Sequence, residues 1–312
     1  MRTRLLLSWL AACVASGACN EHEKAVTTSE APAYAAASDP LEARHETVSV
    51  ERSSDAEQAA RAPSAKACAD DMLSVAGNYC SKVSQVCLRE QGSHRGHPTR
   101  SERCLSYAQP SVCEGTRKAL AFCIDRFEWP NRVDTAPLVL VSWREAGELC
   151  ARAGKRLCTE EEWTLACEGE QMLPYTLGYK RPVDACAIDL PYREPQRPLL
   201  QHSACLADPV CGAELDRIDQ RRPARADSAC FSPFGAVDMN GNVNEWVDAT
   251  AATYPYRGAL KGGWWGPVRN RCRPAVHQHR EDHWGYEIGF RCCRNPDENS
   301  VTPRLETGRE RP

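Results

Sequence analysis

The sequence predicts an α+β fold stapled by disulfide bonds. Two capping boxes, Ser142 with Glu145 and Thr159 with Glu162, each predict the start of a helix. The rest of the second half alternates short strand-like segments with long loops that contain Pro and Gly, a pattern typical of α+β domains. The 312 residues include 18 cysteines, which indicates disulfides in an oxidising compartment when an export signal is also present.

The N-terminus, residues 1–19, is predicted to be a signal peptide of the lipoprotein type. A short basic head precedes an apolar stretch that is too short for a membrane anchor. The residues before Cys13 match the lipoprotein cleavage pattern better. Cleavage at Cys19, however, leaves 16 of the 18 cysteines after it in the mature chain, an even number for disulfide bridges. Cys19 is therefore the predicted lipidation site, Cys13 is the alternative, and ordinary secretion after cleavage at Ala18 is a further one. The expected location is the cell envelope, lipid-anchored or secreted.

Residues 20–67 and 295–312 are predicted to lie outside the folded part. The first segment is rich in Ala, Ser, Glu and Pro and has no Trp or Phe, so it cannot bury enough apolar surface to offset its chain entropy. It is predicted to be a flexible tether, which suits a protein attached to a membrane by a lipid anchor. The second segment is predicted to be a polar tail. The formal net charge is -3 with mixed signs, so no basic patch for nucleic acid is expected.

Residues 68–121 are predicted to form a cysteine-rich extension packed on the main domain. The segment is poor in large apolar residues, and its cysteines fit disulfide staples. A zinc site that combines them with His94 and His97 is the alternative, although no Cys-x-x-Cys pair occurs here. The pairing of these cysteines with one another and with Cys123 stays open at this point.

Residues 122–294 are predicted to be the main domain, because seven of the eight tryptophans lie there. The alternation of residues 122–128 predicts a strand. The first helix, after Ser142, is expected to stop at Gly154, and the second is expected to end near Gly169. Helical spacing turns Cys150 and Cys167 inward.

The polar turn at residues 238–242 lies at the centre of an apolar stretch, residues 234–246. Its Asp, Asn and Gly residues tolerate left-handed backbone geometry. The oxygens between Asp238 and Glu245 suit a hard cation such as calcium, which takes several oxygen ligands. The alternative is a tight turn whose Asp and Asn side chains bond their own backbone.

Several stretches in order resemble the sulfatase-modifying-factor family, whose founding members are formylglycine-generating enzymes. They read VLVSWREA at 139–146, GKRLCTEEEW at 154–163, DMNGNVNEW at 238–246, KGGWW at 261–265 and IGFRC at 288–292. The resemblance covers roughly residues 120–294. It implies the irregular α+β fold of formylglycine-generating enzymes, which is related to C-type lectins.

The resemblance also implies particular bridges and a calcium site. By position, Cys150 is expected to pair with Cys292 and Cys167 with Cys272, and the leftover neighbours Cys158 and Cys293 suggest a third bridge. Weaker candidates are Cys186 with Cys230, and Cys205 with Cys211. The family's calcium loop carries over as the side chains of Asp238 and Glu245 and the carbonyl oxygens of Gly241 and Val243.

The match fails at the oxidase site of the family. Formylglycine-generating enzymes bind copper through two cysteines in the loop that follows Gly-Gly-Ser. Here residues 264–271 contain no cysteine: Trp264 replaces the serine, the first cysteine falls near Pro267 and the second has no counterpart. Because monovalent copper needs thiolates, formylglycine-generating activity is not expected.

The segment 277–283 supplies a second set of candidate ligands. Other family members are iron-dependent sulfur oxygenases of the ergothioneine-synthesis type, although this chain lacks their additional helical domain. Two of His277, His279 and His283 with a carboxylate could form an iron-binding facial triad. The alternative is a solvated polar loop.

These observations favour a non-catalytic binding or structural module of the cell envelope, so whether the protein is an enzyme stays uncertain. Trp264, Trp265, Arg269 and Trp284 are expected to line a cleft that holds a peptide or a glycan. The alternative is a metal-dependent oxidoreductase that uses iron or copper at residues 277–283. A formylglycine generator that acts by another route is a third, less favoured hypothesis.

Overall fold

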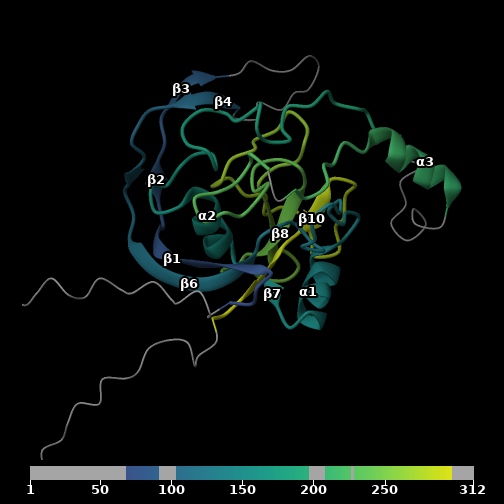
Figure 1. Cartoon of the computed structure of the whole chain (residues 1–312), viewed down its shortest axis with the longest axis horizontal. Coiled ribbons are helices and arrows are strands. Elements are labelled where there is room, and N and C mark those ends of the chain that lie inside the picture. Colours follow the sequence, from purple (N-terminus) through teal and green to yellow (C-terminus); the bar gives the residue numbers. More distant parts are fainter. Residues whose placement is uncertain (1–67, 91–102, 197–207, 226–227, 297–312) are drawn as a thin grey trace, which may run out of the picture. The chain divides into compact units, whose positions relative to one another are not determined.

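The computed structural model describes residues 68–90, 103–196, 208–225 and 228–296 (Figure 1). The expected signal peptide, the tether and nearly all of the polar tail lie outside the described residues. So do Cys13, Cys19, His94, His97 and Cys205. Among the described residues, no helix is long and apolar enough to cross a bilayer.

The larger sheet has four antiparallel strands in the order β1-β6-β11-β7. The long strands β1 (Met72–Cys80) and β6 (Arg117–Asp125) lie side by side (Figure 1), and β11 (Cys292–Arg294) and β7 (Arg156–Leu157) complete the sheet. Strand β6 begins before the expected residues 122–128 and crosses the boundary expected between 121 and 122. The cysteine-rich segment therefore contributes β1 and most of β6 to the central sheet.

The smaller sheet has the order β10-β8-β9. Strand β8 (Asn244–Asp248) pairs in parallel with β10 (Ile288–Phe290) and antiparallel with β9 (Gly258–Lys261). Two short ribbons add β2 (Val83–Ser84) with β5 (Val112–Cys113), and β3 (Cys87–Glu90) with β4 (Cys104–Tyr107). The fold class is thus α+β, as predicted, with small separate sheets.

The two predicted helices are confirmed. In α1 (Trp143–Arg152) and α2 (Glu160–Glu168), both reciprocal bonds of each capping box are present. Gly154 and Gly169, with φ of 68° and 65°, follow the two helix ends. A third helix, α3 (Pro209–Ile218), was not predicted. It is capped by the Asp208 side chain, which accepts a hydrogen bond from the backbone N–H of Val210.

Helix α2 packs against β1, β6, β8 and β9, and α1 packs against β7 and β8. The core beneath α2 centres on Trp163, and a second core beneath α1 includes Trp246, Ile288 and Phe290. Strands β8 to β10 therefore lie in the interior, with their loops left to build a site.

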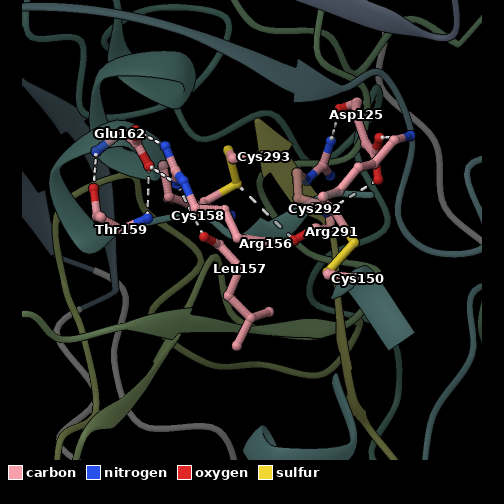
Figure 2. The surroundings of a disulfide bond; sticks show 12 residues. Asp125, Cys150, Arg156, Leu157, Cys158, Thr159, Glu162, Arg291, Cys292 and Cys293 are labelled. Atoms are coloured by element: carbon pink, nitrogen blue, oxygen red, sulfur yellow. Dashed lines mark hydrogen bonds and ion pairs between the residues drawn. A yellow bond between two sulfur atoms is a disulfide. The ribbon is translucent and has the colours of Figure 1, made fainter. Parts of the chain in front are cut away.

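Seven disulfide bonds join described cysteines. The pairs Cys150–Cys292, Cys158–Cys293, Cys167–Cys272 and Cys186–Cys230 are those expected from the sequence. Figure 2 shows that the neighbours Cys292 and Cys293 bond on opposite sides of β11, to Cys150 and to Cys158. The open pairings resolve as Cys68–Cys123, Cys80–Cys113 and Cys87–Cys104, so these cysteines are not zinc ligands.

Candidate functional site

A pocket of about 570 Å³ opens beside the smaller sheet, between residues 264–269 and 276–288. Its size is typical of sites for small organic ligands. Apolar side chains come from the strands: Leu260 lies on β9 and Ile288 on β10, and Val276 exchanges two backbone hydrogen bonds with Leu260. The remaining lining residues are Asn244, Trp264, Val268, Arg269, Gln278, His279, His283, Trp284, Gly285, Tyr286 and Glu287.

Three of the four residues expected in the cleft line this pocket, namely Trp264, Arg269 and Trp284. Trp265 does not, because its side chain is only 1% exposed and packs in a core cluster with Val243. The rings of Trp264 and Trp265 meet edge to face at 5.4 Å. The cleft assignment of Trp265 is therefore corrected: Trp264 faces the pocket while its neighbour supports it from behind.

The structure brings together two of the three candidate histidines. The rings of His279 and His283 are stacked 4.0 Å apart at 9° in the pocket wall. Burial, the neighbouring His283 and Arg269 lower the pKa of His279 to about 4, and burial also lowers the pKa of His283. Both rings are thus neutral at neutral pH. His277 lies elsewhere, with its Nε2 atom 3.6 Å from Oε2 of Glu160, so the three do not form one ligand set.

The carboxylates of the same segment have arginine partners. Glu281 is 1% exposed and accepts hydrogen bonds from Nε and Nη2 of Arg257 at 2.6 and 2.8 Å, and it also pairs with Arg144. Asp282 pairs with Arg280. Across the part of the chain that the structure describes, no three or more His, Cys, Asp or Glu side chains are grouped to hold a metal ion. The predicted facial triad therefore lacks its carboxylate here.

Glu281 anchors the histidine segment, so we expect Glu281→Gln to lower the free energy of unfolding by about 1–2 kcal/mol. Solvent screens the half-exposed Arg257, which keeps the effect modest. Arg257 lowers the pKa of Glu281 below 4.5, so this stabilisation exists above that pH and is lost on acidification. Urea unfolding at pH 7 and at pH 3.5 measures both effects.

The control for this prediction is Asp282→Asn, because Asp282 is exposed and its ion pair is with the exposed Arg280. Its effect should stay below about 0.5 kcal/mol. An equal loss in the two variants would contradict an anchoring role for Glu281, and so would an unchanged acid sensitivity in Glu281→Gln.

The polar turn at 238–242 adopts the left-handed geometry that its residues predict. Asp238, Gly241 and Asn242 have φ of 58°, 93° and 55°. A Cβ atom at Gly241 would lie 2.2 Å from the carbonyl oxygen of Ala187, so only glycine fits there. The Asn242 side chain bonds other segments: it accepts from the backbone N–H of Arg222 and donates to Glu128.

Sequence reasoning missed Glu128, which lies under this turn. Its Oε1 accepts from the backbone N–H of Val243 at 3.1 Å, and its Oε2 accepts from Nδ2 of Asn242 at 2.5 Å. Burial, together with Asp238 and Glu245, raises the pKa of Glu128 well above its usual range, and burial raises the pKa of Asp238 to about 6. Nothing in the sequence indicated this role, because Glu128 is the last residue of the segment 122–128 that was predicted to be a strand.

Glu245, expected as a calcium ligand, has a protein partner. Its Oε1 and Oε2 atoms each accept from Arg291 at 2.7 Å, and Oε2 also accepts from Nε1 of Trp163 at 2.7 Å. The other expected ligand atoms, the Asp238 carboxylate oxygens and the carbonyl oxygens of Gly241 and Val243, are of the type that calcium prefers. Three buried carboxylates, those of Glu128, Asp238 and Glu245, therefore lie at or near the turn, and Arg291 is bound to Glu245.

A family model described as the sulfatase-modifying factor enzyme 1-like domain matches residues 76–296. The chain belongs to this family. The match begins within β1, so the family domain includes part of the segment that the sequence suggested was an extension. The family resemblance recognised in the sequence is thus confirmed.

Among curated proteins, this sulfatase-modifying factor relative is similar to a family member described as inactive and to one described as a formylglycine-generating enzyme. It is 31% identical over 173 residues to inactive C-alpha-formylglycine-generating enzyme 2 of Mus musculus, covering 50% of the chain and 48% of that protein. It is 27% identical over 180 residues to formylglycine-generating enzyme of Mus musculus, covering 50% and 44%. Similarity to serine/threonine-protein kinase pkn1 of Chlamydia caviae is 26% over 182 residues, covering 51% and 24%. The chain spans about half the length of these relatives or less.

Two solved structures are similar in fold. CarF aligns at a TM-score of 0.44 with 16% identity, covering 73% of this chain and 98% of CarF. PvdO from Pseudomonas aeruginosa aligns at 0.39 with 16% identity, covering 70% and 94%.

The pocket of this family member offers no thiol. Residues 264–271, which include Trp264, Val268 and Arg269 of its wall, contain no cysteine. Every cysteine in the described residues is disulfide-bonded, including Cys272 directly after this loop. The chemistry at hand is therefore that of aromatic rings, neutral imidazoles, amides, one guanidinium and one carboxylate.

Proposed function

We propose that this protein is an exported, lipid-anchored binding module of the cell envelope, and that the pocket beside His279 holds its ligand. The observation that carries the proposal concerns the loop 264–271, part of which lines the pocket. It corresponds to the family loop that carries the copper-binding cysteines, but it contains no cysteine. A copper site that activates oxygen with a substrate thiol needs thiolates, so the module does not oxidise cysteine to formylglycine. The disulfide content agrees with life in an oxidising compartment.

The ligand is expected to be a peptide or a glycan. Trp264 and Trp284 offer flat apolar faces on which a peptide side chain or a sugar ring can stack. Asn244 and Gln278 add amide donors and acceptors that fix orientation. One of the similar proteins is described as inactive. This supports the proposal that the fold can serve binding without catalysis in this family.

The alternative is a metal-dependent oxidoreductase that uses iron or copper. The observation in its favour is the pair His279 and His283, which are neutral and line the pocket. Parallel stacked rings do not direct their nitrogen lone pairs at one point, and Glu281 and Asp282 are tied to arginines. Iron binding by this pair therefore requires a rearrangement of the segment.

Metal analysis and an oxidation assay distinguish these functions. The purified, oxidised protein should hold no stoichiometric iron or copper, and it should leave a sulfatase-derived cysteine peptide unconverted with copper present. Formylglycine-generating enzyme of Mus musculus is the positive control for the peptide. His279→Ala is compared with the matched His277→Ala, because His277 lies beside Glu160 and not in the pocket. Stoichiometric iron or copper that is lost only in His279→Ala would establish the oxidoreductase instead.

We also propose that the turn at 238–242 holds calcium through the Asp238 side chain and the carbonyl oxygens of Gly241 and Val243, close to Glu245 and Glu128. A cation there would offset the buried carboxylates that Arg291 does not bind. Calcium at about 100 times its Kd should add roughly 2.7 kcal/mol to the free energy of unfolding. Thermal melts in calcium and in EDTA measure the gain.

The calcium gain should disappear in Asp238→Asn and persist in Asp216→Asn, because Asp216 is an exposed residue on α3. Equal melting temperatures of the unmodified chain in calcium and in EDTA would refute the calcium site. A full gain in Asp238→Asn would place the ion elsewhere.

A further inference from the structure

We propose that the pocket takes an apolar organic anion, whose aromatic or aliphatic body lies against Trp264 and Trp284 and whose carboxylate or sulfonate lies at Arg269 beside His279. This inference rests on the binding function proposed above and specifies the group that the ligand places in the pocket, an apolar body with an anionic end. It follows from the distribution of apolar and charged groups along the pocket wall.

The body of the ligand is defined by the apolar residues of the pocket lining. Leu260 and Ile288 come from neighbouring strands of the smaller sheet, and Val276 is hydrogen-bonded to the first of them. With the two tryptophans, these residues make up the apolar part of the pocket lining. An apolar or aromatic group of the ligand gains free energy by leaving water for such a wall.

The anionic end is defined by Arg269. Arg269 lines the pocket, and its charge is near enough to His279 to lower the pKa of that ring. A planar guanidinium binds carboxylate and sulfonate groups through paired, charge-assisted hydrogen bonds. The neutral rings of His279 and His283 and the amide of Gln278 supply further N–H donors at the same end without adding a second charge.

Glu287 lines the same pocket and carries the opposite charge. Its carboxylate lies back against the chain, since a Cβ atom at Gly285 would approach Oε2 to 2.8 Å. The neighbours that lower the pKa of His279 beyond burial are His283 and Arg269. Arg269 and Glu287 are the charged residues of the pocket lining, so a cationic ligand that uses Glu287 is the outcome that the test must be able to detect.

Two naphthalene probes that differ by one sulfonate test the inference on the full-length oxidised protein. They are 8-anilinonaphthalene-1-sulfonate and the uncharged N-phenyl-1-naphthylamine, followed by fluorescence titration. Arg269→Gln should weaken binding of the sulfonate probe by about tenfold or more and leave the affinity for the uncharged probe unchanged, because only the charge-assisted hydrogen bonds are lost. Arg269→Lys should retain part of the sulfonate affinity.

Two further variants control for folding and location. Arg280→Gln removes an arginine that pairs with Asp282 outside the pocket wall, and it should change neither probe. Trp284→Ala should weaken both probes, because it removes part of the apolar wall. A matching thermal melt for Arg269→Gln shows that the variant is folded.

The outcomes separate the ligand class from the binding function. If Trp284→Ala weakens both probes but Arg269→Gln changes neither, the pocket binds ligands and the anion assignment is wrong. If a cationic naphthylethylenediamine binds more tightly than the sulfonate and weakens in Glu287→Gln, the ligand is a cation. If the unmodified protein binds no probe, or if Trp284→Ala changes none, the proposed binding function fails as well.

Discussion

Arg291→Met is expected to lower the free energy of unfolding by about 3–5 kcal/mol. Arg291 is fully buried and donates to both oxygens of Glu245, and its Nη2 also donates to the carbonyl oxygen of Val237 at 2.8 Å. Methionine fills a similar volume but leaves the Glu245 carboxylate buried beside Glu128 and Asp238 without its cation. A buried charge without a partner is among the costliest defects in a protein core. Urea unfolding at pH 7 measures the loss.

The matched control is Lys118→Met, which breaks the exposed ion pair between Lys118 and Glu161 and should cost less than about 1 kcal/mol. The double variant Arg291→Met with Glu245→Gln removes both charges, so it should recover part of the loss of the single variant. An Arg291→Met protein as stable as Lys118→Met, or a double variant less stable than the single one, would contradict this account.

The regular elements with local signals were predictable from the sequence. Each capping box needs only residues three positions apart, so α1 and α2 could be placed and both begin where expected. Helix α3 begins at an Asp-Pro pair without a capping box, and it was missed. Strand β6 begins at Arg117 rather than at 122, because its exposed first half pairs with β1, and such long-range pairing leaves no local pattern.

The pocket could be predicted only in part, because irregular loops have no side-chain period. Family resemblance placed Trp264, Arg269 and Trp284 near one another, and they do line one pocket. It could not tell that Trp265 points into the core or that His277 faces Glu160. Glu128 lies more than 100 residues from its partner Asn242, so its role depends on a contact that only the folded chain creates.

Removal of the Cys167–Cys272 bridge, by Cys167→Ala with Cys272→Ala, is expected to lower the free energy of unfolding by about 4–5 kcal/mol in the chain-entropy account. The bond closes a loop of sequence separation 105 and joins α2 to the residue that follows the pocket loop 264–271. Next to it, Arg273 donates to both carboxylate oxygens of Glu168 at 2.7 and 2.6 Å. This ion pair should keep the double variant folded at 25 °C while the loop gains freedom. Both urea unfolding and titration with N-phenyl-1-naphthylamine measure the outcome.

The comparison that decides the point is Cys87→Ala with Cys104→Ala. This bond joins β3 to β4 at a sequence separation of only 17, so the same account expects a smaller loss of about 3 kcal/mol. Neither cysteine lines the pocket, so naphthylamine affinity should be unchanged in this control and reduced in the Cys167 and Cys272 variant. Cys167 lies on α2, and Cys272 directly follows the loop that contains Trp264 and Arg269. A loss of stability without a loss of naphthylamine affinity would therefore mean that this loop is held in place by its own packing. Equal losses of affinity in both variants would mean that the effect on the pocket is global, and the bridge would then have no particular part in shaping the site.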